Sequence, residues 1–129
     1  MYYYFDYKSD EIGNNILSQP LSTPFKSVQK TAMPITNGWL EGAEKIPSPH
    51  CDARPDSTAV SLLVVHNISL PPGEFGGHYI SDLFLGQLDK NAHPYFSTIY
   101  KLKVSAHCLI QRNGHIIQFV SFNDRAWHA

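Results

Sequence analysis

His66 and Asn67 end a run of apolar residues that begins at Val60, and a stiff Pro-Pro-Gly loop at residues 71–73 follows shortly after them. A neutral imidazole held by rigid neighbours at the end of a strand is a good metal ligand, and imidazole is a common ligand of zinc. A half-buried histidine that hydrogen bonds to the backbone is the alternative interpretation. Asn67 would orient a ligand amide or the His66 ring, although asparagine after a strand is also an ordinary turn residue.

Trp127 and His128 form a second candidate group near the C-terminus. A tryptophan beside a histidine at a strand end makes a flat apolar wall with a polar tip, which suits a sugar or a peptide. A core tryptophan is the alternative. His107 could approach the same crevice, but a structural histidine is the favoured interpretation. We expect the other histidines to be solvated: His50, His78, His93 and His115.

No catalytic residue can be assigned from pattern alone. Glu74 and Asp124 are the nearest carboxylates in sequence, and they form no paired arrangement for acid–base work. The sequence contains no H-E-x-x-H motif, phosphate-binding glycine loop or nucleophile elbow.

Four elements are predicted to position these residues. Residues 60–66 have apolar side chains on both faces, which predicts a central strand that is buried on both sides and ends at His66. Apolar residues at helical spacing predict an amphipathic helix over residues 78–88, with Gly86 a weak point near its end. Pro94 suits the first turn of a second, shorter helix that runs through Tyr100.

The fourth element is a β-hairpin around Asn113-Gly114, a pair favoured in tight type I′ turns. A two-residue loop would place Ile110 opposite Ile117 and Cys108 opposite Phe119, and we expect this face to be the core. The opposite face, which includes His107, is mixed. The order strand, helix, helix, hairpin predicts an α/β fold with a mixed central β-sheet and covering helices.

The composition limits the class of protein. The chain has 129 residues, enough for one core, and a formal net charge of −1 without a basic stripe, so no nucleic-acid partner is expected. No apolar run is long enough to span a bilayer and the N-terminus lacks the pattern of a signal peptide, so we expect no membrane partner and a cytoplasmic location. Cys51 and Cys108 match no metal spacing and are expected to be free thiols. Residues 1–38 lack periodicity and are predicted to be a poorly ordered extension.

Several segments of residues 39–129 resemble the N-terminal half of the AmpD-type anhydro-N-acetylmuramyl-L-alanine amidases. The most specific is Val-Val-His-Asn-Ile-Ser-Leu-Pro-Pro-Gly-Glu-Phe-Gly-Gly at residues 64–77. The others include Ala-His-Pro-Tyr-Phe at 92–96, Val-Ser-Ala-His-Cys-Leu-Ile at 104–110 and Arg-Ala-Trp-His-Ala at 125–129. The resemblance covers 39–129 as the N-terminal portion of an amidase domain with the peptidoglycan recognition protein-like fold.

The resemblance implies a zinc-dependent hydrolase of bacterial cell-wall recycling. Its substrate would be an anhydromuropeptide, cut at the amide between the lactyl group and L-alanine. His66 matches the first zinc ligand of the family, whereas Asn67, Trp127 and His128 match residues that line the substrate groove. In the family a catalytic Glu, two further zinc ligands and a Lys follow the Trp-His-Ala segment, and this sequence ends at Ala129. We therefore expect a truncated chain that is inactive by itself. A non-catalytic muropeptide-binding module and an incompletely folded fragment are the alternatives.

Overall fold

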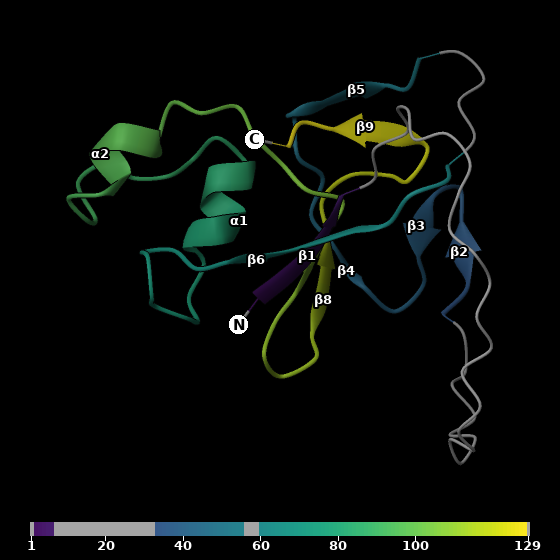
Figure 1. Cartoon of the computed structure of the whole chain (residues 1–129), viewed down its shortest axis with the longest axis horizontal. Coiled ribbons are helices and arrows are strands. Elements are labelled where there is room, and N and C mark those ends of the chain that lie inside the picture. The colour runs from purple at the N-terminus through teal and green to yellow at the C-terminus, as the bar shows by residue number, and fades with distance from the viewer. Residues whose placement is uncertain (1, 7–32, 56–59, 129) are drawn as a thin grey trace, which may run out of the picture.

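A computed structural model describes residues 2–6, 33–55 and 60–128, the first range by its backbone only. Its central element is a five-stranded mixed sheet with the order β4-β8-β7-β1-β6 (Figure 1). These strands are β1 (Tyr2–Asp6), β4 (Glu44–Lys45), β6 (Val64–Ile68), β7 (Cys108–Ile110) and β8 (Ile116–Gln118). β4 pairs with β8 in parallel, and the other neighbours are antiparallel.

Two small sheets and two helices accompany the central sheet. β2 (Ile35–Thr36) pairs with β3 (Trp39–Leu40), and β5 (Cys51–Ala53) pairs with β9 (Asp124–Ala126). The helices α1 (Tyr79–Phe84) and α2 (Phe96–Ile99) follow β6 in the chain. The expected class, a mixed sheet with covering helices, is confirmed. Within the described ranges, no helix is long and apolar enough to cross a membrane.

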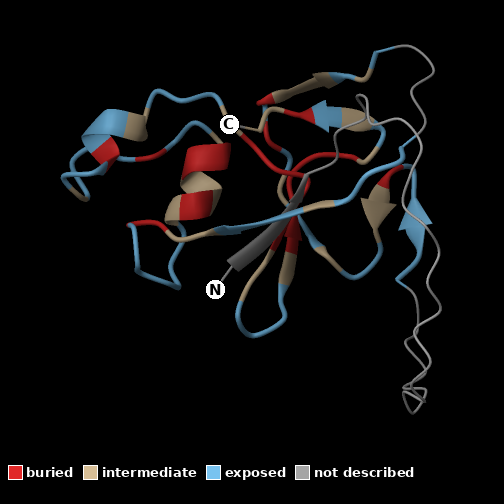
Figure 2. Ribbon diagram, viewed as in Figure 1, coloured by how far each residue is buried: buried red, intermediate tan, exposed pale blue. Residues whose placement is uncertain are grey.

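The core lies between α1 and the sheet. Phe84 of α1 packs edge-on against Phe119, with 5.2 Å between ring centroids. Leu109 of β7 and Ile117 of β8 are opposite each other in the ladder and both are buried. Figure 2 shows buried segments in α1 and around β7 and β8, whereas β6 is largely exposed.

Both helices are shorter than predicted. α1 ends at Phe84 because Gly86 takes a φ of +71°, outside the helical region, although Ile80, Leu83 and Phe84 are buried as their spacing predicts. α2 occupies only Phe96–Ile99, inside the predicted range of residues 94–100.

The predicted register of the β7–β8 hairpin is wrong by one residue. Ile110 pairs with Ile116, and Gln111 N–H donates to the His115 carbonyl at 2.8 Å, so the loop has three residues. A type I′ turn needs positive φ at both central residues, but of the pair Asn113-Gly114 only Gly114 has it. The slip changes the faces, so that Leu109 and Ile117 share the core side.

The prediction that residues 60–66 form a central strand buried on both sides is also wrong. The strand is Val64–Ile68, and it lies at the end of the described sheet with β1 as its neighbour. Leu62, Leu63 and Val65 are exposed. His66 is consequently in the middle of the strand.

β1 lies within the range that was expected to be poorly ordered. Its backbone pairs with β6 on one side and β7 on the other, so a strand occurs where the sequence predicted none. Residues 7–32 of that range are outside the described residues, and the division at residue 38 stays a prediction.

Candidate functional site

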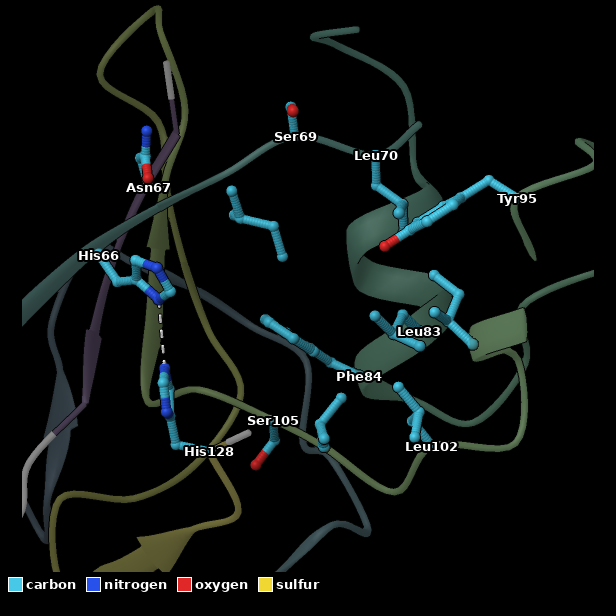
Figure 3. A pocket seen from close by; sticks show the side chains of 13 residues that line it. His66, Asn67, Ser69, Leu70, Leu83, Phe84, Tyr95, Leu102, Ser105 and His128 are labelled. Atoms are coloured by element: carbon cyan, nitrogen blue, oxygen red, sulfur yellow. Dashed lines mark hydrogen bonds between the residues drawn. The ribbon is translucent and has the colours of Figure 1, made fainter. Parts of the chain in front are cut away.

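His66 and His128 face each other across the end of the central sheet. His66 points from β6, and His128 follows β9 by two residues. The Nδ1 atom of His66 lies 3.4 Å from Nε2 of His128, and the ring centroids are 5.5 Å apart (Figure 3). His66 is exposed and His128 half-buried, so a ligand in solvent can reach both rings.

The two histidines form one side of a cavity of about 230 Å³. Its opposite side is apolar and comes from α1 and from the segment around α2. Figure 3 shows Leu70, Leu83, Phe84 and Leu102 across the opening from His66. The cavity therefore offers two imidazoles at one side and an apolar surface at the other, which is a usual arrangement for a small-molecule site.

Asn67 also lines this cavity. Successive side chains of a strand point to opposite faces, so Asn67 and His66 leave β6 in different directions. Figure 3 shows the Asn67 amide on the far side of His66 from His128. Asn67 can hydrogen bond to a ligand in the cavity, but its side chain leaves β6 on the face opposite to the His66 ring and so does not orient that ring.

Trp127 does not line this cavity. Its ring stacks on His50, with 6.2 Å between centroids and 10° between planes. Its backbone is held by Ser105, because Ser105 N–H donates to the Trp127 carbonyl at 2.8 Å and Trp127 N–H donates to Ser105 Oγ at 3.1 Å.

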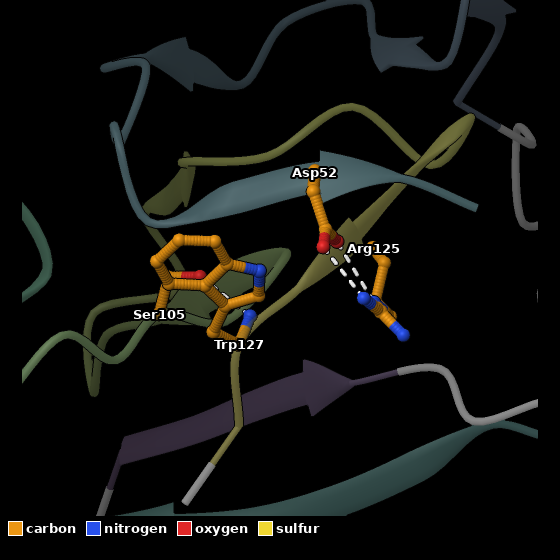
Figure 4. Close-up of polar contacts among 4 residues, drawn as sticks. All are labelled: Asp52, Ser105, Arg125 and Trp127. Atoms are coloured by element: carbon orange, nitrogen blue, oxygen red, sulfur yellow. Dashed lines mark hydrogen bonds and ion pairs between the residues drawn. The ribbon is translucent and has the colours of Figure 1, made fainter. Parts of the chain in front are cut away.

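Asp52 forms an ion pair with Arg125 across the β5–β9 ladder (Figure 4). Arg125 donates from Nε to Asp52 Oδ1 at 2.8 Å and from Nη2 to Oδ2 at 2.5 Å. These hydrogen bonds are the main reason that the pKa of Asp52 is below its ordinary value. Asp52 is therefore a carboxylate at neutral pH.

The histidines outside the cavity differ in environment. His107 is fully buried, and its Nε2 lies 2.9 Å from the Asp124 carbonyl oxygen, so the structural interpretation holds and the His66 cavity does not contain it. His50 was expected to be solvated but is only 8% exposed, and its Nδ1 lies 3.0 Å from the Val104 carbonyl oxygen. That expectation is wrong because Pro47 and Pro49 lead the chain into the core, where Ser48 is buried and hydrogen bonds to Phe84.

The histidine pair has a spacing that suits zinc. Zinc–nitrogen distances of about 2.0–2.1 Å place two ligands of a tetrahedron roughly 3.4 Å apart. The 3.4 Å between His66 Nδ1 and His128 Nε2 therefore corresponds to two corners of such a site. Within residues 33–55 and 60–128, no group of three or more His, Cys, Asp or Glu side chains gathers to supply a third corner.

Sequence reasoning missed Asp52, Ser105 and His50 as supports of the Trp127–His128 segment. Their contacts join residues 22 to 77 positions apart in the chain, so no local pattern connects them. The two cysteines are free, as predicted.

The chain was compared with known proteins. The N-acetylmuramoyl-L-alanine amidase family matches residues 56–129. The 1,6-anhydro-N-acetylmuramyl-L-alanine amidase AmpD of Citrobacter freundii is 63% identical over 97 residues, which are 75% of this chain and 52% of that protein. The AmpD protein of Escherichia coli K12 is 61% identical, and the match covers 75% of this chain and 53% of that protein. The AmpD protein of Haemophilus influenzae is 59% identical, and the match covers 74% of this chain and 52% of that protein.

A solved structure gives the same result. The crystal structure of a selenomethionine derivative of AmpD matches with a TM-score of 0.72 and 62% identity, covering 74% of this chain and 54% of that one. The resemblance seen in the sequence is confirmed. The chain spans about half the length of the curated relatives that it matches.

Proposed function

Because the chain belongs to the N-acetylmuramoyl-L-alanine amidase family, we propose that it serves the hydrolysis of the amide bond between the lactyl group and L-alanine in anhydromuropeptides. The observation that carries this proposal is the position of His66, which stands at one side of a cavity with an apolar opposite wall. A muropeptide combines an amide with sugar and methyl groups, and a cavity of this kind suits both parts.

The proposed cofactor is zinc, held by His66. A bound zinc ion polarises a carbonyl oxygen and lowers the pKa of its water. His128 is close enough to contribute a second imidazole, since the two nitrogens are 3.4 Å apart. A catalytic zinc takes about three protein ligands, so this pair supplies part of a site.

Asn67, Trp127 and His128 are proposed to contact or border the substrate. Asn67 offers an amide and His128 an imidazole to a ligand in the cavity. Trp127 lies behind His128, where its contribution is indirect. We further propose that the protein acts in cell-wall recycling in the cytoplasm and that residues 39–129 are the N-terminal portion of an amidase domain.

The 129-residue chain alone is proposed to lack turnover, because the described residues bring no third metal ligand to the histidine pair. The test is an assay in which a synthetic anhydromuropeptide is incubated with the chain and zinc. Release of the free peptide measures hydrolysis. We expect no turnover by the chain. Turnover that disappears in His66→Ala and persists in His115→Ala would contradict the inactivity and confirm the site.

Zinc binding tests the metal ligand separately. Titration followed by calorimetry should show binding by the wild type, with a loss of at least about tenfold in affinity in His66→Ala. His115 is an exposed histidine on the β7–β8 hairpin, so His115→Ala is the matched control and should bind zinc like the wild type. Equal zinc affinity in His66→Ala would remove His66 from the site.

A non-catalytic muropeptide-binding module is the second candidate. It is favoured by the cavity, whose apolar wall from α1 and the α2 segment does not depend on a metal. Binding of the muropeptide in the presence of a chelator would support it, and no heat at millimolar ligand would exclude it. Cooperative thermal unfolding would exclude an incompletely folded fragment.

A further inference from the structure

We propose that the N-terminal strand β1 positions His66, because its register with β6 turns the imidazole toward His128 and the cavity. The value of that arrangement for metal binding rests on the proposed function, but the arrangement itself can be tested without it. The evidence is the pairing of β1 with its two neighbours in the central sheet and the exposure of β6. What β1 contributes to these pairs is its backbone.

β1 is the strand that joins β6 to the rest of the central sheet. It lies between β6 and β7 and pairs antiparallel with both (Figure 1). Among the residues that the structure describes, no other strand pairs with β6. In this part of the chain, the strand that carries His66 is therefore connected to the sheet through the hydrogen bonds of β1.

The register forms a row of opposite residues across the sheet. Tyr4 is opposite His66 in β6 and opposite Leu109 in β7, and Leu109 is in turn opposite Ile117 in β8. Residues directly opposite each other in an antiparallel sheet have their side chains on the same face. Leu109 and Ile117 are buried in the core, so this row directs His66 to the core face of the sheet.

A shift of this register by one residue would reverse the site. Such a shift moves every side chain of a strand to the other face, so Val65 or Asn67 would take the core face and His66 would point away from the cavity. Val65, His66 and Asn67 are all exposed, so their burial does little to select one register. Ile68 contacts the core at the end of β6, and pairing with β1 keeps the residues before it extended and in register.

His128 is held by a different part of the molecule. The Ser105 N–H donates to the carbonyl of Trp127 at 2.8 Å, and the Trp127 N–H donates to Ser105 Oγ at 3.1 Å. The Trp127 ring stacks on His50. These contacts do not include β1. The two imidazoles thus come from separately held segments, and the His66 side of their 3.4 Å approach depends on β1.

The first experiment replaces Tyr4 by proline in the full chain. Proline has no N–H donor and is not tolerated inside a paired central strand, so Tyr4→Pro should separate β1 from its neighbours. In nuclear magnetic resonance, the wild type should show nuclear Overhauser effects between the His66 and His128 rings and between the His50 and Trp127 rings. In Tyr4→Pro the first effect should disappear and the second should remain.

The matched control is Tyr4→Val, which keeps the N–H and introduces a residue that favours strands. It should retain both effects. Retention of the His66–His128 effect in Tyr4→Pro would overturn the proposal. Loss of that effect in Tyr4→Val, with the His50–Trp127 effect intact, would also overturn it, because the backbone of β1 would then be insufficient to place His66.

Amide hydrogen exchange decides the proposal if Tyr4→Pro does not fold. Tyr4→Gly keeps the N–H but weakens the strand, so the amides of residues 64–68 that bond to β1 should exchange roughly two- to fivefold faster. The Ser105 amide, which donates to Trp127, and the Gln111 amide, which donates to His115, should exchange as in the wild type. Equal acceleration at all of these amides, or none in β6, would overturn the proposal.

Calorimetry with zinc keeps this proposal apart from the proposed function. The zinc affinity of Tyr4→Pro should fall at least about tenfold, at the low end of what residues that orient metal ligands contribute, and Tyr4→Val should bind like the wild type. A wild type that shows the His66–His128 effect but binds no zinc would contradict the proposed metal site and leave the role of β1 intact. Wild-type zinc affinity in Tyr4→Pro would contradict the positioning role alone.

Discussion

At the scale of single residues, the chemistry depends on neighbours that lie far away in sequence. The pattern of residues 60–67 was sufficient to nominate His66, because an imidazole after apolar residues is conspicuous. It could not show that His128 would be 3.4 Å away, since the two residues are 62 positions apart. His50 shows the same limit. Its neighbours in sequence are two prolines and a cysteine, which indicate a loop, but long-range contacts bury it.

Burial also controls the two thiols. Burial raises the pKa of Cys108 to about 12. The pKa of the half-buried Cys51 is also raised, first by burial and then by the nearby Asp124 and Asp52 carboxylates. Only roughly one Cys108 in 10,000 is a thiolate at pH 8, and the thiolate is the reactive form. We expect iodoacetamide at pH 8 to modify Cys51 before Cys108, and Cys108 to react only when urea unfolds the chain. Mass spectrometry of tryptic peptides with and without urea measures this.

The same shift has a consequence for stability. A thiol whose pKa is raised by folding favours the folded state at low pH, and this contribution is lost as the pH rises from the ordinary thiol value towards about 12. Cys108→Ser should therefore reduce the alkaline fall in the free energy of unfolding. An unchanged fall between pH 9 and pH 11 would contradict the burial of this thiol.

At the scale of elements, one dipeptide occurs twice with different results. Asn37-Gly38 connects β2 to β3 as a two-residue turn with φ values of +51° and +81°, as a type I′ turn requires. Asn113-Gly114 has positive φ at Gly114 only and belongs to a three-residue loop. The sequence signal is the same, so the strands and their long-range partners select the turn. The Gly38 carbonyl, for example, accepts hydrogen bonds from Phe122 and Gln118.

The two glycines make a matched pair of substitutions. Gly114→Ala adds a methyl group that meets no atom within 4 Å among the described residues beyond its two chain neighbours, so the positive φ of +84° is what opposes it, at a cost of about 1–2 kcal/mol. Gly38→Ala has nearly the same φ but places Cβ 2.2 Å from Ser121 Oγ and 3.0 Å from the Asn123 backbone nitrogen. We expect it to cost at least about 2 kcal/mol more, because the turn or the Ser121 segment must move. Urea unfolding of both variants gives the difference, and equal costs would show that Gly38 is not packed against Ser121.

At the scale of the whole molecule, local patterns predicted the class of fold but not the order of the strands. The mixed sheet and the helices after β6 follow from periodicity, and the crystal structure of the AmpD derivative has the same arrangement over the matched part. β1 was not predicted, although Tyr and Phe at residues 2–5 favour strands. Pairing between residues 2–6 and residues 64–68 closes a long loop, and no local signal specifies such a partner.

The position of β6 at the end of the described sheet has a consequence for the behaviour of the chain in solution. Leu63 and Val65 are 62% and 52% exposed, and Val60 and Leu62 extend this apolar surface along the chain. An edge strand with exposed apolar side chains is a site of association between chains. We expect the protein to self-associate as its concentration rises, and we expect Leu63→Lys to reduce this association, because burying an ammonium group between two chains is unfavourable.

Ile35→Lys is the control, since Ile35 is 58% exposed but lies in the separate two-stranded β2–β3 sheet. It adds the same charge and should leave the association largely unchanged. Light scattering over a concentration series measures the effect, and thermal unfolding verifies that both variants keep the fold. An equal reduction of association by the two substitutions would show that net charge controls solubility. A reduction by Leu63→Lys alone would locate the association at the β6 edge.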